Sequence, residues 1–183
     1  MKIEAQHLED ANKNLLDAHK DNFDYLATKL TNNGHNVEKI LNKLAEFQVA
    51  IPSWALGAGG TRFGRFSFYG EPSTLEQKIE DVGLLHSLTQ TAGAVSLHIP
   101  WDVPEDYNAV KELASSLDIK FDAVNSNTFQ DQKDAAETYK YGSLSNTSQA
   151  VREQAIQHNL DVINIGNKLG SKALTVLLKE PYL

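Results

Sequence analysis

The sequence predicts an α/β fold built on a parallel sheet, and three observations support this. Four short apolar segments with many β-branched residues recur along the 183-residue chain. Segments with helical periodicity alternate with them, which is typical of parallel strands joined by right-handed crossovers. The first three apolar segments run into aromatic or polar residues, as strands do when their carboxyl ends face a ligand.

The second of these segments is the most informative. The four segments with an expected strand are residues 49–56, 94–102, 121–130 and 172–178. In the second, a buried-strand pattern leads directly into His98, Pro100, Trp101 and Asp102. A parallel strand delivers substrate-contacting groups to the carboxyl edge of its sheet, so His98 is the first candidate for such a group.

The first 47 residues are expected to form a helical extension, and residues 48–183 the remainder of the fold. Apolar residues recur at one-face spacing in two stretches, with a break at 32–34. The first stretch contains Leu8, Ala11 and Leu15, and the second contains Val37, Ile40, Leu41 and Leu44. The extension holds no convergent chemistry, which favours a role as a cap or an oligomer contact.

Three further helices are expected between and after the strands. Ser73 and Glu76 form a capping box that opens a helix with Leu75, Ile79 and Val82 on one face. Pro104 marks the start of the next helix. The third helix runs over 148–169 with Ile156, Leu160 and Ile163 on its apolar face, and Gly170 ends it. Residues 131–141 are expected to form a short helix with a loop.

Composition excludes several classes of function. The formal net charge is −7 without a basic cluster, which argues against a nucleic-acid partner. The chain has no cysteine, so disulfides, thiolate metal sites and thiol catalysis are excluded. No window approaches the ~18 uninterrupted apolar residues of a membrane span. The N-terminus lacks a secretory core, so we expect a cytoplasmic protein that does not associate with membranes.

The residues alone leave two sheet architectures open, namely an open doubly wound sheet and half of an eight-stranded barrel. A nucleotide-binding open sheet would show a G-x-G-x-x-G turn. Gly57, Gly59 and Gly60 do not complete it, because Arg62 occupies the sixth position. Four strands would also leave two open edges and an apolar inner face, which association could cover.

Several blocks closely resemble the bacterial L-rhamnose isomerases with broad aldose specificity. They are residues 51–57, 59–66, 96–102, 121–130 and 170–176. The resemblance covers nearly the whole chain after the first helices, but only the amino-terminal portion of that family. It implies a (β/α)₈ barrel of the xylose-isomerase-like group, here its first four βα units, that interconverts aldoses and ketoses with a divalent metal, commonly Mn²⁺.

The resemblance also implies roles for four residues. Trp54 and Phe129 would be aromatic walls of the sugar pocket, and His98 would hydrogen-bond the sugar. Phe63 would belong to a loop that a neighbouring subunit contributes, since the family forms homo-oligomers, namely tetramers. The partner that the resemblance implies is therefore a small-molecule sugar. Large aromatics can equally fill a core, and a strand histidine can be a core residue.

Two departures from the family pattern limit what this chain can do. Leu177 stands where the family usually has a tryptophan, so the pocket loses one wall. The metal ligands of the family come from later strands, and we expect no metal ligand and no catalytic residue here. His98, Asp102, Asn125 and Asn127 are a poor ligand set, and Asp102 is expected to cap the helix near Pro104.

Three functional hypotheses follow. The chain is the amino-terminal half of a metal-dependent L-rhamnose isomerase, inactive alone because the metal that stabilises the developing oxyanion is missing. Alternatively, it is a non-catalytic half-barrel that associates through its open sheet edges, or it belongs to a sugar epimerase of the same barrel group. The blocks around Trp54, Phe63 and His98 favour the first.

Overall fold

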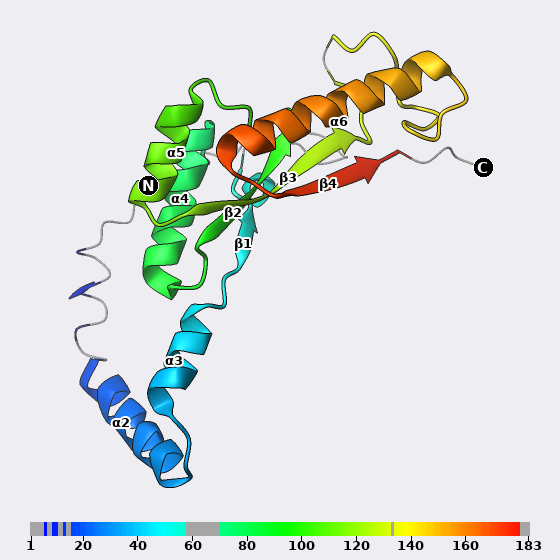
Figure 1. Cartoon of the computed structure of the whole chain (residues 1–183). Coiled ribbons are helices and arrows are strands. Elements are labelled where there is room, and N and C mark those ends of the chain that lie inside the picture. The colour runs from blue at the N-terminus through cyan, green and yellow to red at the C-terminus, as the bar shows by residue number, and fades with distance from the viewer. Residues whose placement is uncertain are drawn as a thin grey trace. The chain divides into compact units, whose positions relative to one another are not determined.

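The computed structural model describes residues 6, 9–10, 13, 16–57, 70–132 and 134–179 of the chain. Contacts divide the chain into two compact units, Met1–Gln48 and Val49–Leu183. The first unit contains helices α2 (Leu16–Asn32) and α3 (Val37–Ala45), separated by a turn in which Gly34 has φ +81° (Figure 1). Two helices with a break near residue 33 are therefore confirmed. Leu8, Ala11 and Leu15 lie outside the described residues.

Helix α3 is amphipathic, but its apolar face is not buried. The Asn36 side chain caps it by accepting a hydrogen bond from the Lys39 N–H at 2.8 Å. Ile40, Leu41 and Leu44 share one face, as their spacing predicts, and are 37%, 43% and 61% exposed. No residue of α2 or α3 is buried. The apolar face of α3 is therefore not buried within the first unit.

The second unit is built on a four-stranded parallel sheet. Its strands are β1 (Ala50–Pro52), β2 (Ala94–Ile99), β3 (Lys120–Thr128) and β4 (Ala173–Leu178), in the order β1-β2-β3-β4 (Figure 1). All three neighbouring pairs are parallel, as predicted. The first strand is shorter than expected, because Ser53–Ala55 turn into the 3₁₀ helix η1.

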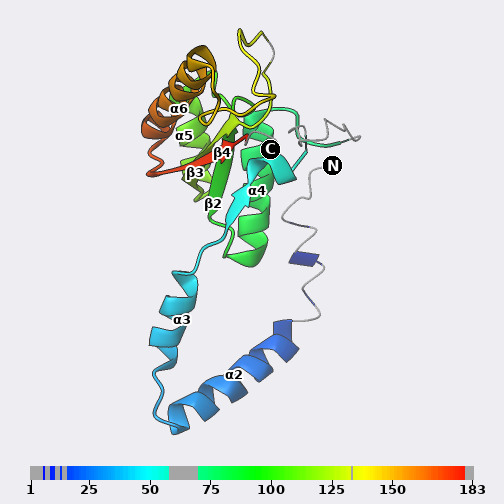
Figure 2. The same ribbon diagram turned by 90° about the vertical axis from the view of Figure 1, so that its right-hand side faces the viewer.

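Helices α4 (Leu75–Thr89), α5 (Tyr107–Ser116) and α6 (Gln149–Leu169) connect the strands and pack against one face of the sheet. Figure 2 shows α5 and α6 beside β3 and β4. One apolar core joins residues of the three helices to Val95, Leu97 and Ile99 of β2. The strand order does not reverse as it does in a doubly wound sheet. The arrangement is compatible with part of a (β/α)₈ barrel, which four strands do not close.

The other face of the sheet is polar near the carboxyl ends of the strands. Because side chains alternate along a strand, Ser96 and His98 lie opposite the core residues of β2. Asn125 and Asn127 alternate in the same way with Val124, which packs beneath α6. The expectation of an apolar inner face is therefore wrong for this part of the sheet.

The starts of α4 and α5 differ from the predicted ones. The capping box of α4 is formed by Thr74 and Gln77 rather than by Ser73 and Glu76, because the Gln77 Oε1 reaches the backbone N–H groups of both Ser73 and Thr74. Leu75, Ile79 and Val82 are buried, as predicted. Helix α5 begins after Asp106, whose carboxylate accepts hydrogen bonds from the backbone N–H groups of Asn108 and Ala109.

Helix α6 has the predicted extent but buries a different face. Ser148 precedes it, and Gly170 follows it with φ +82°. The buried residues are Val151, Ala155, Val162, Gly166 and Leu169. The predicted stripe of Ile156, Leu160 and Ile163 is 49%, 49% and 39% exposed. The prediction was wrong because α6 carries two apolar stripes, and the one with Gly166 allows the closest approach to β3.

The segment after β3 differs from the expected one. Residues 131–141 form turns and bends in their described part, and the expected short helix is absent there. Among the helices that the structure describes, none has both the length and the hydrophobicity of a membrane span.

Candidate functional site

Three of the four predicted site residues meet at the carboxyl edge of the sheet. His98 is the penultimate residue of β2, Trp54 lies in η1 directly after β1, and Phe129 follows the last residue of β3. The register aligns Pro52 with Ser96 and His98 with Asn125, which brings these strand ends side by side. The prediction that the strand ends converge is therefore correct for these residues.

The imidazole of His98 lies at the centre of this aromatic group. Its ring centroid is 5.4 Å from that of Trp54 and 6.1 Å from that of Phe129, both in edge-on geometry. Trp101 stacks on it, with centroids 4.0 Å apart and planes inclined by 30°. No role was predicted for Trp101 from the sequence, although it belongs to the same segment as His98. The three aromatic rings are each partly exposed, and they surround the imidazole.

His98 is deeply buried and lacks hydrogen bonds from its ring. Its exposed fraction is 2%, and neither Nδ1 nor Nε2 has a partner among the described residues. Burial lowers the pKa of His98 to about 4, because desolvation penalises the charged ring; His158 and Lys78 lower it further, and Asp102 opposes them. Near neutral pH the ring is therefore uncharged, with one donor and one acceptor unused.

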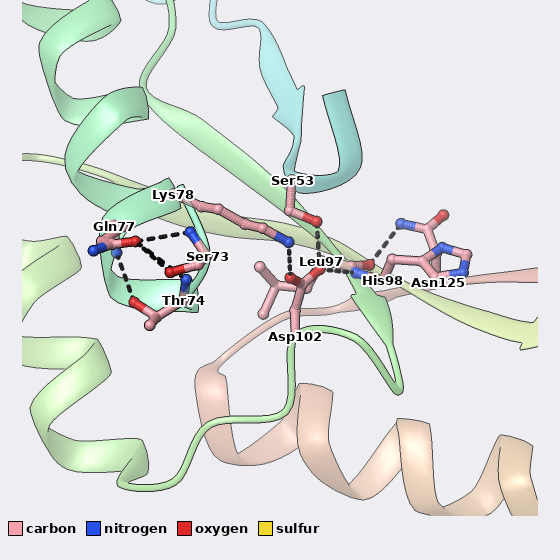
Figure 3. Close-up of polar contacts among 9 residues, drawn as sticks. All are labelled: Ser53, Ser73, Thr74, Gln77, Lys78, Leu97, His98, Asp102 and Asn125. Carbon is pink, nitrogen blue, oxygen red and sulfur yellow. Dashed lines mark hydrogen bonds and ion pairs between the residues drawn. The ribbon is translucent and has the colours of Figure 1, made fainter. Parts of the chain in front are cut away.

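Asp102 fixes the backbone around His98. Its carboxylate accepts hydrogen bonds from the Ser53 hydroxyl, from the His98 backbone N–H at 2.8 Å and from the Lys78 ammonium at 2.6 Å (Figure 3). Lys78 and Asp102 are both almost fully buried. The expectation that Asp102 caps a helix is wrong: Asp106 caps α5, and Asp102 joins α4, η1 and β2.

The residues at this edge do not fit a divalent metal ion. The Asp102 carboxylate is already occupied by three donors. Asn125 donates to the Leu97 carbonyl, and Asn127 exchanges hydrogen bonds with Gln130. Within the described part of the chain, no group of three or more histidine and carboxylate residues could hold a metal. A hard cation requires several free oxygen or nitrogen ligands, so no metal chemistry is assigned to these residues.

The sequence also assigned Phe63 and position 177 to the predicted pocket. Phe63, the fourth predicted site residue, lies outside the described residues. Leu177, which stands in place of an expected aromatic wall, is in β4 and pairs in register with Asn127 of β3. Its side chain is 37% exposed. Among the residues that the structure describes in β4, position 177 therefore presents an aliphatic side chain rather than an aromatic ring.

A second imidazole, which is half-buried, lies close to this region. His158 belongs to α6, and its Nε2 has no partner among the described residues. Burial lowers the pKa of His158, whereas a hydrogen bond with the Ile99 backbone and the charge of Asp161 oppose this effect. The sequence pattern predicted that His158 points away from the apolar stripe of α6. This prediction is confirmed: His158 lies between Ala155 and Val162 on the buried face of α6, opposite the exposed stripe of Ile156, Leu160 and Ile163.

Comparison with known proteins identifies relatives that are named as sugar isomerases. No protein-family model matches the chain. The chain is 47% identical over 174 residues to "Probable sugar isomerase R00627" of Rhizobium meliloti (strain 1021), which covers 95% of this chain and 40% of the relative. It is 49% identical over 155 residues to "Probable sugar isomerase mlr5709" of Mesorhizobium japonicum, covering 85% of this chain and 36% of the relative. The chain is a homologue of proteins named as sugar isomerases and spans about two fifths of the length of these curated relatives.

Proposed function

We propose that the chain is part of a metal-dependent aldose–ketose isomerase of the L-rhamnose isomerase type, and that it supplies the aromatic half of the sugar pocket. In this proposal the active protein is a cytoplasmic homo-oligomer that acts on a small sugar with Mn²⁺. Two observations support it: the names of the relatives and the position of the aromatic group at the carboxyl edge of a parallel sheet.

Beyond these two, the observation that carries the proposal is the environment of His98. A buried polar group without a partner costs about 1–3 kcal/mol, so it is expected to persist where a ligand supplies the missing hydrogen bonds. One sugar hydroxyl can donate to the unprotonated ring nitrogen, and another can accept from the ring N–H. The rings of Trp54, Trp101 and Phe129 suit the apolar C–H faces of the same molecule.

We expect this chain alone to bind the sugar weakly and not to isomerise it. The residues present supply a neutral hydrogen-bonding imidazole and aromatic contacts. They do not supply the charge that stabilises an oxyanion during isomerisation. In the complete protein, Mn²⁺ would supply this charge from ligands contributed elsewhere. We therefore expect the chain to recognise an aldose without converting it to a ketose.

A titration with L-rhamnose tests the proposal. Binding is followed by tryptophan fluorescence and by the NMR signal of the His98 Cε1–H. We expect a saturable change that His98→Leu abolishes. His86→Gln is the matched control, because His86 is also a buried histidine with an unpartnered Nδ1, but it lies at the end of α4 beside Asp118. Equal responses of the wild type and His98→Leu would refute the sugar site. Ketose formed by this chain with Mn²⁺ would refute its inactivity.

A second candidate function is association without catalysis, and the exposed apolar residues favour it. Strand β4 is an edge of the sheet, and its Leu174, Leu177 and Leu178 are 37%, 37% and 45% exposed. An edge strand with exposed apolar side chains is a template for pairing with another chain. Sedimentation velocity distinguishes the outcomes: a concentration-dependent dimer supports association, and a monomer at all concentrations contradicts it.

A further inference from the structure

The carboxylate of Asp102 connects three segments that are far apart in the sequence. Its donors come from η1, from β2 and from α4, and none belongs to the helix that follows it (Figure 3). The Asp102 side chain is 1% exposed and that of Lys78 is 3% exposed. The carboxylate is therefore a buried junction rather than a surface ion pair.

Two of these connections involve the segments that carry residues of the candidate sugar pocket. The donor Ser53 immediately precedes Trp54, and Asp102 itself immediately follows Trp101. The other connection is made directly to the His98 backbone, whose carbonyl also accepts a hydrogen bond from the Asp102 N–H at 2.9 Å. One side chain thus holds the segments that carry both indoles and the imidazole.

Stability alone is a weak explanation for this arrangement. A buried ion pair must repay the desolvation of two charges, and apolar replacements of such pairs are often neutral or stabilising. An apolar residue at position 102 could fill the space between α4 and β2. It could not accept hydrogen bonds from the Ser53 hydroxyl and the His98 N–H, so it would not fix these two segments relative to each other.

We propose that Asp102 is a positioning residue of this site: its carboxylate, neutralised by Lys78, holds the His98 backbone and the turn that carries Trp54 in one arrangement. The imidazole is thereby presented to a bound sugar, and in this last respect the proposal rests on the function proposed above. Lys78 contributes to the same positioning, because its ion pair with Asp102 offsets the cost of burying the carboxylate.

The proposal predicts the direction in which the pKa of His98 shifts when the Lys78–Asp102 pair loses one of its two charges. The charged and titratable groups that act on the His98 ring are Asp102, Lys78 and His158. Lys78→Met leaves the negative charge of Asp102 uncompensated, so we expect the pKa of His98 to rise by about one unit. Asp102→Asn leaves the positive charge of Lys78 and is expected to lower this pKa further. The double variant is expected to return it toward the wild-type value.

The experiment compares these variants with Asp106→Ala in the full chain. Asp106 caps α5 with its side chain and contacts none of the pocket rings, so Asp106→Ala reports what loss of a helix cap alone does. The readouts are the NMR titration of the His98 Cε1–H, the near-ultraviolet circular dichroism of the tryptophans, and L-rhamnose affinity. We expect Asp102→Asn to change the tryptophan spectrum and to weaken sugar binding about tenfold, whereas Asp106→Ala changes neither.

Several outcomes would overturn the positioning role. An unchanged tryptophan spectrum in Asp102→Asn would do so, as would pKa shifts of the same sign in the two single variants. If Asp102→Asn does not fold, Lys78→Met and the double variant test the proposal. The pKa of His98 must then rise in Lys78→Met and return toward the wild-type value in the double variant. If the wild type binds no sugar, the proposed function fails, but the spectrum and the pKa still decide whether Asp102 positions His98 and Trp54.

Discussion

The indole of Trp101 stacks on the imidazole of His98 with ring centroids 4.0 Å apart. The next residue in the sequence, Asp102, accepts a hydrogen bond from the His98 backbone N–H at 2.8 Å. The histidine is therefore fixed both through its ring and through its backbone. Its ring nitrogens nevertheless have no partner among the described residues. A side chain that is rigidly held but chemically unsatisfied is typical of a preorganised binding site.

Stability is expected to fall as the solution is acidified below pH 6.5. The folded-state pKa of His98 is lowered from 6.5 to about 4, so the unfolded state binds the proton first and stability is lost as the pH falls through this window. A shift of this size corresponds to about 3 kcal/mol. Urea unfolding between pH 7 and pH 4 measures it. His98→Leu should flatten the dependence, and His19→Gln on exposed α2 should leave it unchanged; equal slopes in all three proteins would contradict this.

Replacement of Gly166 should loosen the packing of α6 on β3. A Cβ at this position would lie 2.8 Å from the Val124 Cγ2, so Gly166→Ala is expected to cost about 1–3 kcal/mol through overpacking. Val124→Ala in the same chain should recover part of this loss, because it removes the clashing methyl groups. Denaturant unfolding of the four proteins of this cycle gives the coupling energy.

Gly170→Ala is the matched control for this cycle. Gly170 has φ +82°, and a Cβ added there would meet nothing within 4 Å, so its substitution strains the backbone without a steric contact. Val124→Ala should therefore not rescue it. Rescue of both glycine variants, or of neither, would show that the contact between α6 and β3 does not set the cost.

Divalent metal is expected to have no effect on the stability of this chain. The Asp102 carboxylate already accepts hydrogen bonds from three donors, and no cluster of metal-binding residues occurs in the part of the chain that the structure describes. An ion that binds only the folded state would raise the melting temperature. Thermal unfolding should therefore be the same in millimolar Mn²⁺ and in excess chelator. A rise of several degrees with Mn²⁺ would show that the chain contains a metal site.

The exposed stripe of α6 should tolerate charge, whereas its buried stripe should not. Leu160 is 49% exposed, so Leu160→Lys is expected to change stability by less than about 0.5 kcal/mol. Val162 is completely buried, and Val162→Lys should unfold the chain because a lysine cannot be buried there without a partner. Circular dichroism in urea distinguishes the two. If the stripe mediates self-association, Leu160→Lys should also weaken it in sedimentation experiments.

Local pattern was sufficient for the order and extent of most elements. Apolar runs predicted the four strands, and Gly170 predicted where α6 ends, because these signals act within a few residues of the chain. The convergence of Trp54, His98 and Phe129 also followed from the sequence. Parallel strands in sequential order bring their carboxyl ends to one edge, and each of these residues lies at such an end.

The tertiary structure decided which of several local possibilities is realised. Helix α6 carries two apolar stripes, and only its fit against Val124 selects the one with Gly166 over the one with Leu160. The same holds for Asp102, whose partners Lys78 and Ser53 are 24 and 49 residues away in the sequence. A carboxylate between a strand and a helix predicts a cap from local pattern alone. Its burial, and the cation that makes burial tolerable, arise from contacts that no local spacing encodes.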